Sequence, residues 1–272
     1  MPARIFDTHA HINYPQFIDR MDEVISQCRE VGVEKIVAIA TDLESSRTIL
    51  QLADKYPQVY AVPGWHPCDC LNAPEDIREE LLELAKHPKV VAIGETGLDF
   101  YRLPSQSDPP GSLEEDEIYK LKQLSLFDQQ IEVAAELGLN LVIHQRSAFE
   151  ETYERLKPWS DRVRGVFHCF VGTPDQQARL QQINSLVSFT GIITFKNAEE
   201  VRETVRATPI DQLMLETDCP YLAPVPYRGK LCQPHHVFHV AETIAAEKNV
   251  TLEELGEITC RTAASFFRGL DG

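Results

Sequence analysis

The stretch RIFDTHAH, from Arg4 to His11, decides the fold. Residues 4–6 form a short apolar run typical of a buried strand, and polar residues with two histidines follow at once. Similar runs return along the chain, each followed by a longer segment. The predicted strands are residues 4–6, 35–40, 59–62, 90–93, 140–143, 163–167, 186–189 and 212–215. This alternation predicts a parallel sheet covered by helices.

Segments of helical period lie between and after these runs. They are expected at residues 17–31, 45–56, 74–86, 117–137, 174–183 and 198–206, with two more at 235–248 and 252–267. Thr173, before a first-turn proline, Asn197, before a glutamate-rich first turn, and Thr251, before two glutamates, are predicted helix caps. Residues 101–116 are rich in proline, serine and acidic residues, which predicts a surface loop on the rim.

Eight strand and helix units are the number that closes a (β/α)8 TIM barrel, an α/β fold of about 250 residues. The chain has 272 residues, so we expect one domain over 1–272, with extra C-terminal helices after the eighth strand. An open doubly wound sheet is the alternative. No glycine-rich phosphate loop follows any predicted strand, which disfavours the nucleotide-binding form of that alternative.

Charge and cysteine content narrow the classes of function. The 26 basic and 42 acidic residues leave a net charge of -16, which opposes coating of nucleic acid or binding to an anionic membrane. Any phosphate chemistry therefore has to be local. The 7 cysteines include no CxxC pair and indicate reduced thiols. Because no signal-peptide run or membrane-length apolar stretch is present, we expect a cytoplasmic enzyme without a membrane partner.

Polar residues suited to chemistry follow the apolar runs, in residues 7–11, 94–99, 144–146, 168–170 and 216–218. In an α/β barrel the strand ends converge on one face, where active sites are built. His9 and His11 stand two residues apart, so in extended backbone they project to the same side and can grip one ion. Alone, such a pair is equally compatible with ordinary hydrogen-bonded histidines.

The full set of strand-end residues predicts a metal site. The candidate ligands are four imidazoles and two carboxylates, namely His9, His11, His144, His168, Glu95 and Asp218. Such a mixed set suits zinc, manganese or related ions. Six ligands exceed the needs of one tetrahedral zinc ion, whereas two ions bridged by a carboxylate use all of them. Any one residue could instead cap a turn or lie in the core, but their joint placement favours a dinuclear site.

Six stretches carry a resemblance that spans nearly the whole chain: FDTHAH (6–11), GETGLDFY (94–101), IHQR (143–146), HCFVG (168–172), TGIITFKNA (190–198) and ETDCPYLAP (216–224). They resemble, in the same order, the motifs of the TatD-type metal-dependent hydrolases, within the amidohydrolase-like group of TIM barrels. The resemblance implies a divalent-metal-dependent phosphodiesterase acting as a deoxyribonuclease, with 3′ to 5′ exonuclease activity in some members.

The resemblance also implies residue roles. It assigns the ligands of two divalent ions, zinc, magnesium or manganese, as His9, His11 and Asp218 for the first, His144 and His168 for the second, and Glu95 as the bridge. On such a site we expect Asp218 to act as general base on a bound water, with Glu95 as the second catalytic residue. Glu216 and Asp99 either orient a ligand or hold local structure.

Substrate binding is expected at three basic residues, Arg146, Lys196 and Arg228, although a charge in a rim loop is usually only solvated. The expected substrate is a DNA strand end or a small phosphodiester, with no obligate protein partner. Residues 228–234 lack the Asn-Glu-Pro or Asn-Ser-Pro that family members often carry after Arg-Gly. The 101–116 loop looks longer and more acidic than usual, which could exclude a duplex or favour short ends.

Two other classes of function stay open. An amidohydrolase-type enzyme on the same barrel would cleave a C–N or lactone bond, but its dinuclear relatives commonly bridge the metals with a carboxylated lysine where this chain has Glu95. A scaffold holding a structural metal is disfavoured, because such zinc sites are closed four-ligand sets, often rich in cysteine. Cys169 and Cys219 neighbour proposed ligands but are expected to point to the opposite side, so neither is expected to be a nucleophile.

Overall fold

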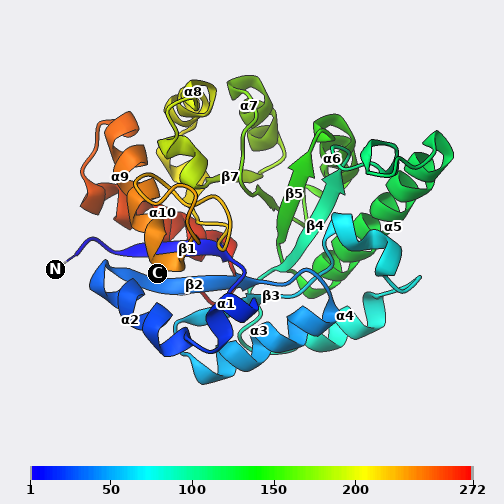
Figure 1. Ribbon diagram of the computed structural model, residues 1–272, viewed down its shortest axis with the longest axis horizontal. Helices are drawn as coiled ribbons and strands as arrows, with labels where there is room; N and C mark the ends of the chain where they lie inside the picture. The colour runs from blue at the N-terminus through cyan, green and yellow to red at the C-terminus, as the bar shows by residue number, and fades with distance from the viewer. Residues whose placement is uncertain (1, 271–272) are drawn as a thin grey trace.

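The computed structural model describes residues 2–270 and contains eight parallel strands there, arranged in chain order (Figure 1). They are β1 (Ile5–Ala10), β2 (Val33–Ile39), β3 (Val59–Val62), β4 (Ile93–Asp99), β5 (Leu141–Arg146), β6 (Gly165–Phe167), β7 (Leu186–Phe189) and β8 (Leu213–Leu215). Continuous ladders join β1 to β3 and β4 to β8. Parallel bridges between Ala10 and Cys219 and between Ala61 and Val90 link the two groups, so the predicted (β/α)8 barrel is confirmed.

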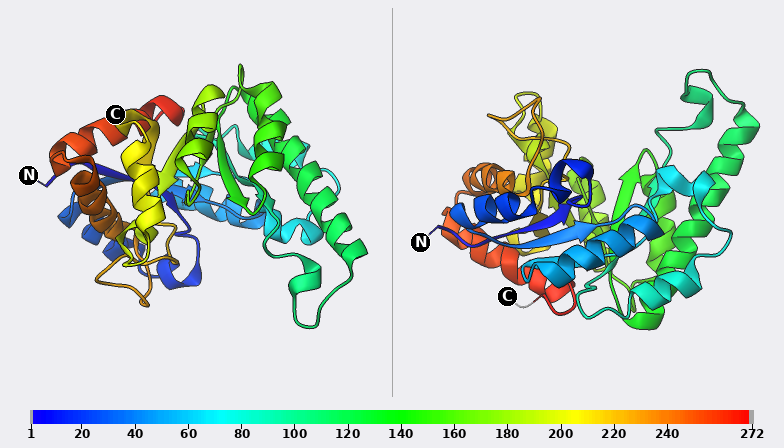
Figure 2. Two further views of the ribbon diagram at one scale, coloured as in Figure 1. Left: turned by 90° about the horizontal axis from the view of Figure 1, so that it is seen from above. Right: turned by 60° about the horizontal axis from the view of Figure 1, so that its bottom comes forward.

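Helices surround the strands, as the views in Figures 1 and 2 show. They are α1 (Pro15–Ile18), α2 (Met21–Glu30), α3 (Leu43–Lys55), α4 (Arg78–Leu84), α5 (Leu113–Leu137), α6 (Phe149–Leu156), α7 (Pro174–Gln182), α8 (Glu199–Ala207), α9 (Val237–Lys248) and α10 (Leu252–Phe266). Short 3-10 turns are η1 (Pro67–Asn72), η2 (Pro104–Gln106), η3 (Lys157–Trp159), η4 (Gly191–Thr194), η5 (Ile210–Gln212) and η6 (Pro234–His236). Among residues 2–270, no helix combines the length and apolarity that crossing a bilayer requires.

Two of the three helix caps predicted from the sequence are present. The third, Asn197, is wrong, because α8 has Ala198 at its N-cap and no side-chain cap hydrogen bond. Thr173 accepts a hydrogen bond from the Gln176 backbone at the start of α7, and Thr251 accepts one from Glu254 at the start of α10. In each case the third helical residue returns a hydrogen bond to the cap backbone, which completes a capping box. The two helices therefore begin within one residue of their predicted starts.

The interior of the barrel is closed at one end by the C-terminal helix. Buried strand side chains such as Phe6, Val142 and Met214 form one cluster with Phe266 and Phe267, at the end of α10. The Asn140 amide, at the start of β5, also donates to the Phe266 carbonyl at 2.6 Å. Since α10 covers the amino ends of the strands, the carboxyl ends are left for a functional site.

Three strands extend past the carboxyl ends of the predicted apolar runs: β5 continues to Arg146, beyond the expected end at 143, and β1 and β4 continue through buried polar residues. Residues 4–6 were expected as a strand, but β1 continues through Asp7, Thr8 and His9 to Ala10, and all six residues of β1 are buried. Residues 90–93 were expected as a strand, whereas β4 is Ile93–Asp99 and buried throughout. The expectations were wrong because these polar side chains pair with one another inside the protein, which an apolar pattern cannot indicate.

Register shifts in these same strands aim polar side chains into the barrel. Phe6 lies in the interior cluster, so strict alternation would turn Thr8 inward and His9 outward. The β1 to β2 ladder is irregular between Asp7 and Ala10, and the β4 to β5 ladder is irregular between Ile93 and Thr96. Irregularities of this kind reorient side chains. Here they lie at the positions of His9 in β1 and Glu95 in β4.

Three helical predictions need correction. The helix expected at 74–86 is confined to Arg78–Leu84, and α6 was not predicted at all. The expected loop at 101–116 ends at Ser112, which caps α5 with a capping box, so Leu113 to Asp116 belong to the first helical turn. Glu114, Glu115 and Asp116, which were expected in the loop, therefore lie in the first turn of a helix, where negative charge is favourable. Both views of Figure 2 show that this segment and α5 project from the barrel.

Candidate active site

Glu95, in β4, lies at the centre of the polar residues on the carboxyl face, and its side chain is 2% exposed. Its Oε2 is 3.4 Å from His9 Nε2 and 3.5 Å from His11 Nε2. Its Oε1 is 2.9 Å from His144 Nδ1 and 2.8 Å from His168 Nε2. The two oxygens of one carboxylate thus face two different groups of imidazole nitrogens.

The first group is formed by His9, His11 and Asp218. The Nε2 atoms of His9 and His11 are 3.3 Å apart, and Asp218 Oδ1 lies 3.7 Å from the former and 3.4 Å from the latter. Asp218 follows β8, and its backbone N–H donates to the His9 carbonyl at 2.9 Å. The contact between the first and last strands therefore sets the position of this carboxylate relative to the histidine pair.

The second group contains His144, from β5, and His168, which follows β6, with His66 beside them. His66 Nε2 lies 3.3 Å from Glu95 Oε1 and 3.3 Å from His144 Nδ1. The sequence prediction missed His66. The signal for it was present, because His66 comes four residues after the predicted strand at 59–62, as polar residues do at the other strand ends.

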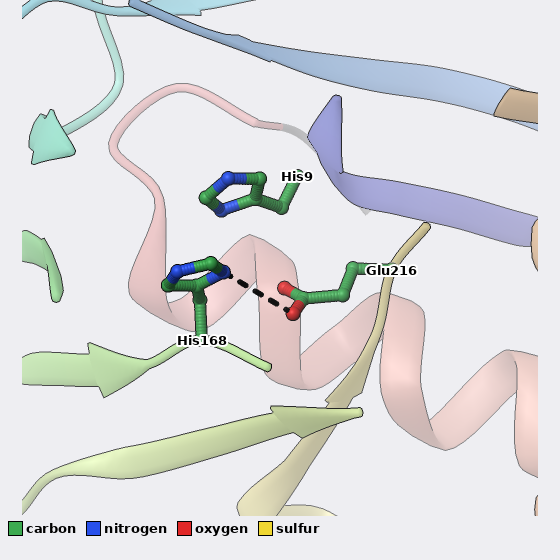
Figure 3. A group of neighbouring side chains, drawn as sticks. All are labelled: His9, His168 and Glu216. Carbon is green, nitrogen blue, oxygen red and sulfur yellow. Dashed lines mark ion pairs between the residues drawn. The ribbon is translucent and has the colours of Figure 1, made fainter. Parts of the chain in front are cut away.

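The second ring nitrogens of His11 and His144 are held by partners outside the two groups. His11 Nδ1 donates to the Ile39 carbonyl at 3.1 Å, and His144 Nε2 donates to Asp99 Oδ2 at 3.0 Å. Glu216 Oε1 accepts from the Cys169 backbone N–H at 2.6 Å and lies 3.7 Å from His168 Nδ1. Figure 3 shows this carboxylate directed toward the stacked rings of His9 and His168, whose centroids are 4.0 Å apart.

The sequence left open whether Asp99 and Glu216 orient ligands or hold local structure. Asp99 orients His144 directly through the hydrogen bond to Nε2. Asp7, to which the sequence assigned no role, is fully buried and accepts from both the backbone and the hydroxyl of Thr217 at 2.9 and 2.7 Å. It thereby ties β1 to the segment that carries Asp218.

The nitrogen atoms of the histidine pair are spaced as the ligands of a divalent metal ion are spaced. Tetrahedral ligands at about 2.0–2.1 Å from zinc stand about 3.3–3.4 Å apart. The separation of 3.3 Å between the His9 and His11 nitrogens matches this spacing. In the neutral form that binds a metal ion, the hydrogen bond to Ile39 leaves His11 Nε2 without a hydrogen, and the one to Asp99 leaves His144 Nδ1 without one.

Burial and neighbouring histidines set the ionisation of the carboxylates. Burial alone would raise the pKa of Glu95, but the charges of His168, His66 and His9 hold that pKa well below its usual value. For Asp99, burial raises the pKa and the His144 hydrogen bond lowers it, with a net result of about 2. Both carboxylates are therefore anionic near neutral pH, the form that binds cations.

The six predicted ligands are brought together, and the three predicted substrate-binding residues are surface side chains. Arg146, Lys196 and Arg228 are exposed. The Arg146 guanidinium stacks over Tyr101 at 3.7 Å, and that of Arg228 stacks over Phe195 at 4.3 Å. These two arginines are held against aromatic rings, as cation–π contacts allow.

An aromatic pair adjoins the first group of ligands. Tyr14 stacks on His11 with centroids 5.5 Å apart, and Tyr221 meets Tyr14 edge-on at 6.2 Å. Tyr221 is 52% exposed, so its ring is available to a bound molecule. The sequence prediction did not include either tyrosine.

Burial raises the pKa of the Cys169 thiol to about 12, and it raises the pKa of Cys219 as well. Both side chains are therefore protonated near neutral pH. Cys169 Sγ contacts the Thr190 hydroxyl at 3.5 Å. A thiol held in its protonated form is a poor nucleophile, which agrees with the expectation that neither cysteine attacks a substrate.

Comparison with known proteins places these residues in a family. A sequence model of the family described as "TatD related DNase" matches residues 6–268. The chain belongs to the TatD family. Bacillus subtilis YabD, an "uncharacterized metal-dependent hydrolase", is 38% identical over 97% of this chain and 99% of its own. The "3'-5' ssDNA/RNA exonuclease TatD" of Shigella flexneri is 32% identical over 89% of this chain and 90% of its own.

Solved structures of the TatD family share the same barrel. YJJV, a TatD homologue from Escherichia coli, superposes with a TM-score of 0.87 at 27% identity, covering 98% of this chain and 99% of its own. A TatD-family hydrolase from Entamoeba histolytica gives a TM-score of 0.82 at 21% identity, covering 98% of this chain and 99% of its own. The chain is therefore a metal-dependent hydrolase of the TatD family, as the sequence motifs implied.

Proposed function

We propose that this TatD-family hydrolase is a dinuclear phosphodiesterase that removes nucleotides from DNA strand ends, with 3′ to 5′ polarity. The observation that carries the proposal is Glu95, whose two oxygens face two separate groups of imidazole nitrogens. A carboxylate so placed is suited to bridge two ions, and two ions are a common arrangement in nucleases and phosphatases.

The proposed ligands are His9, His11 and Asp218 for one ion, His144 and His168 for the other, and Glu95 for both. Bound zinc, magnesium or manganese would supply an acidified water and polarise the phosphodiester. The buried carboxylates balance the charge of the ions, and Asp99 holds the His144 ring in the tautomer that leaves Nδ1 free. All these side chains come from strands or strand ends of one rigid barrel, which suits precise ligation.

Asp218 is the proposed general base. Its side chain is 14% exposed, so a water in the site can reach it, while Glu95 is almost fully enclosed. Burial raises the pKa of Asp218, but the nearby His11, His9 and His168 rings lower it more, so the group is anionic and able to accept a proton. Glu95 contributes to catalysis as the buried negative charge shared by the two groups.

Three features support a single strand as the substrate. The name of the Shigella flexneri relative assigns that protein to single-stranded DNA and RNA. The exposed ring of Tyr221, beside Tyr14 and His11, offers a surface on which a terminal base can stack. Arg146 and Arg228, held against Tyr101 and Phe195, and the exposed Lys196 provide local positive charge for phosphates.

The compartment is part of the proposal. All seven cysteines lie within residues 2–270 and are free thiols. We propose that the enzyme works in the cytoplasm, where thiols stay reduced. Fractionation of the source cells, with this protein followed by antibody, would test the location.

Hydrolysis of end-labelled DNA tests the proposed function. Protein stripped with a chelator and reloaded with Mn²⁺ should release mononucleotides from a single strand labelled at its 3′ end, and the stripped protein should not. The matched controls are a strand blocked at its 3′ end and the Asp218→Asn variant. Cleavage of an amide or lactone panel without release of nucleotides would reject the phosphodiesterase and favour an amidohydrolase.

A further inference from the structure

His66 stands among the atoms proposed to hold the second metal ion, but its hydrogen bonding differs from that of its neighbours. It follows β3 and precedes η1, and its Nε2 lies 3.3 Å from both Glu95 Oε1 and His144 Nδ1. By distance alone, His66, Glu95 and His144 could form a ligand group. The hydrogen bond made by the second ring nitrogen of His66, Nδ1, argues against a role as metal ligand.

His66 Nδ1 accepts a hydrogen bond from the Cys68 backbone N–H at 3.1 Å, which makes His66 the N-cap of η1. A neutral imidazole carries one hydrogen, and the nitrogen that accepts has to be the bare one. The hydrogen of His66 is therefore on Nε2, the atom that faces the site. A metal ligand needs the opposite arrangement, with a bare nitrogen toward the ion.

His11 and His144 show that opposite arrangement. Their outer nitrogens face oxygen acceptors, the Ile39 carbonyl and the Asp99 carboxylate, so their hydrogens point away from the site. His66 thus presents an N–H where the other two present lone pairs. Its side chain is 15% exposed, so an oxygen of a bound molecule can approach it.

We propose that His66 is a hydrogen-bond donor to an anionic phosphoryl oxygen of the substrate and not a metal ligand. This rests on the proposed phosphodiesterase function. Without substrate, His66 Nε2 is within hydrogen-bond distance of the His144 Nδ1 lone pair, at 3.3 Å, and lies 3.3 Å from Glu95 Oε1. A phosphate bound beside Glu95 and His144 takes the hydrogen bond instead, and a fixed donor stabilises charge that develops on that oxygen during attack.

Two substitutions of His66 distinguish the effect of losing its Nε2–H donor from the effect of losing its cap on η1. His66→Asn keeps a side-chain oxygen able to accept from Cys68, since asparagine is a good N-cap, but removes the Nε2 donor. His66→Gln loses the ring cap and keeps an amide N–H near the Nε2 position. His144→Ala, which removes a proposed ligand, is the control for metal loss.

Metal content is the first readout, and it needs no substrate. After loading with Mn²⁺ and gel filtration, His66→Asn should hold as much manganese as the wild type, whereas His144→Ala should hold less. Loss of manganese from His66→Asn equal to that from His144→Ala would show that His66 is a ligand and overturn the proposal.

Binding of inorganic phosphate and turnover form the second readout. In the loaded protein, His66→Asn should weaken phosphate binding in calorimetry and lower kcat on end-labelled DNA about a hundredfold, the scale for one lost transition-state donor. His66→Gln should recover part of both. Wild-type phosphate affinity and kcat in His66→Asn would overturn the proposal. If no variant or wild type cleaves DNA, the proposed function fails, while metal content and phosphate affinity still test His66.

Discussion

At the scale of single residues, the partner of each outer ring nitrogen decides what an imidazole can do in the site. Asp99 and the Ile39 carbonyl leave His144 and His11 with lone pairs facing inward, and the Cys68 N–H leaves His66 with a hydrogen there. The partners of His144 and His11 come from other strands, and the partner of His66 comes from the turn that it caps. The residue types in the sequence therefore do not reveal the roles; the hydrogen bonds do.

Asp99→Ala tests this directly. Without its acceptor, His144 is free to change tautomer and orientation, so we expect metal affinity or turnover to fall about 10-fold to 100-fold, the range for second partners of metal-binding histidines. A Mn²⁺ titration with an assay of DNA hydrolysis measures both. Asp161→Ala, at a side chain that is 80% exposed, is the control and should match the wild type. Equal behaviour of the two variants would contradict the role given to Asp99.

Much of the candidate site could be predicted at this scale. The six proposed ligands were selected because each follows or ends an apolar run, and the barrel does bring strand ends together. His66 was not selected, because Pro63 and Gly64 separate it from its strand and it stands alone. Tyr14 and Tyr221 were missed because isolated tyrosines in loops carry no pattern.

At the scale of elements, predictions succeeded where local sequence controls the backbone. The capping boxes at Thr173 and Thr251 are local and were found, whereas the cap expected at Asn197 is absent from the start of α8. The strand limits of β1 and β4 were wrong because their polar residues are buried through contacts with distant segments, such as Asp7 with Thr217. The alternation of apolar and polar residues in a sequence does not indicate which polar residues are buried by contacts with distant segments.

Removal of the Thr251 cap should weaken the helix that closes the barrel. Thr251 satisfies the Glu254 backbone N–H at the start of α10, so Thr251→Ala should lower the free energy of unfolding by about 1 kcal/mol. Urea denaturation followed by circular dichroism measures the change. Thr251→Ser keeps the hydroxyl and should restore most of the stability; equal loss in both variants would exclude the cap as the cause.

One buried and one exposed residue of α5 test how this helix packs on the barrel. Phe127 is fully buried, so Phe127→Ala should destabilise the protein by about 3–5 kcal/mol through lost burial and a cavity. Leu121 is 65% exposed on the same helix, and Leu121→Ala should change the stability by less than about 0.5 kcal/mol. Thermal or urea unfolding of the pair gives the comparison, and similar losses would mean that the packing of α5 is misplaced.

At the scale of the whole molecule, the ends of the chain complete the barrel. β1 contacts the segment after β8, and α10 packs against the interior cluster, so distant parts of the sequence depend on one another. We propose on this basis that the whole chain acts as one domain. The net charge of -16 opposes extended contact with DNA, so binding of the proposed strand-end substrate would depend on a few local cations.

Salt dependence tests that electrostatic picture. Each phosphate contact contributes about 0.7 to the slope of log affinity against log salt for a single strand. Arg228→Ala should reduce the slope for a short oligonucleotide by about that amount, whereas Lys157→Ala, at the end of α6, should leave it unchanged. Fluorescence anisotropy across a salt series measures the slope. An unchanged slope in Arg228→Ala would remove this residue from the substrate path.

The number of metal ions bound per chain tests the shared role of Glu95 most directly. Chelator-stripped protein is titrated with Mn²⁺, separated from free metal and analysed for metal and protein content. We expect two ions per wild-type chain, as in other carboxylate-bridged sites, and at most one in Glu95→Ala. A single ion per wild-type chain, unchanged in Glu95→Ala, would contradict the dinuclear site.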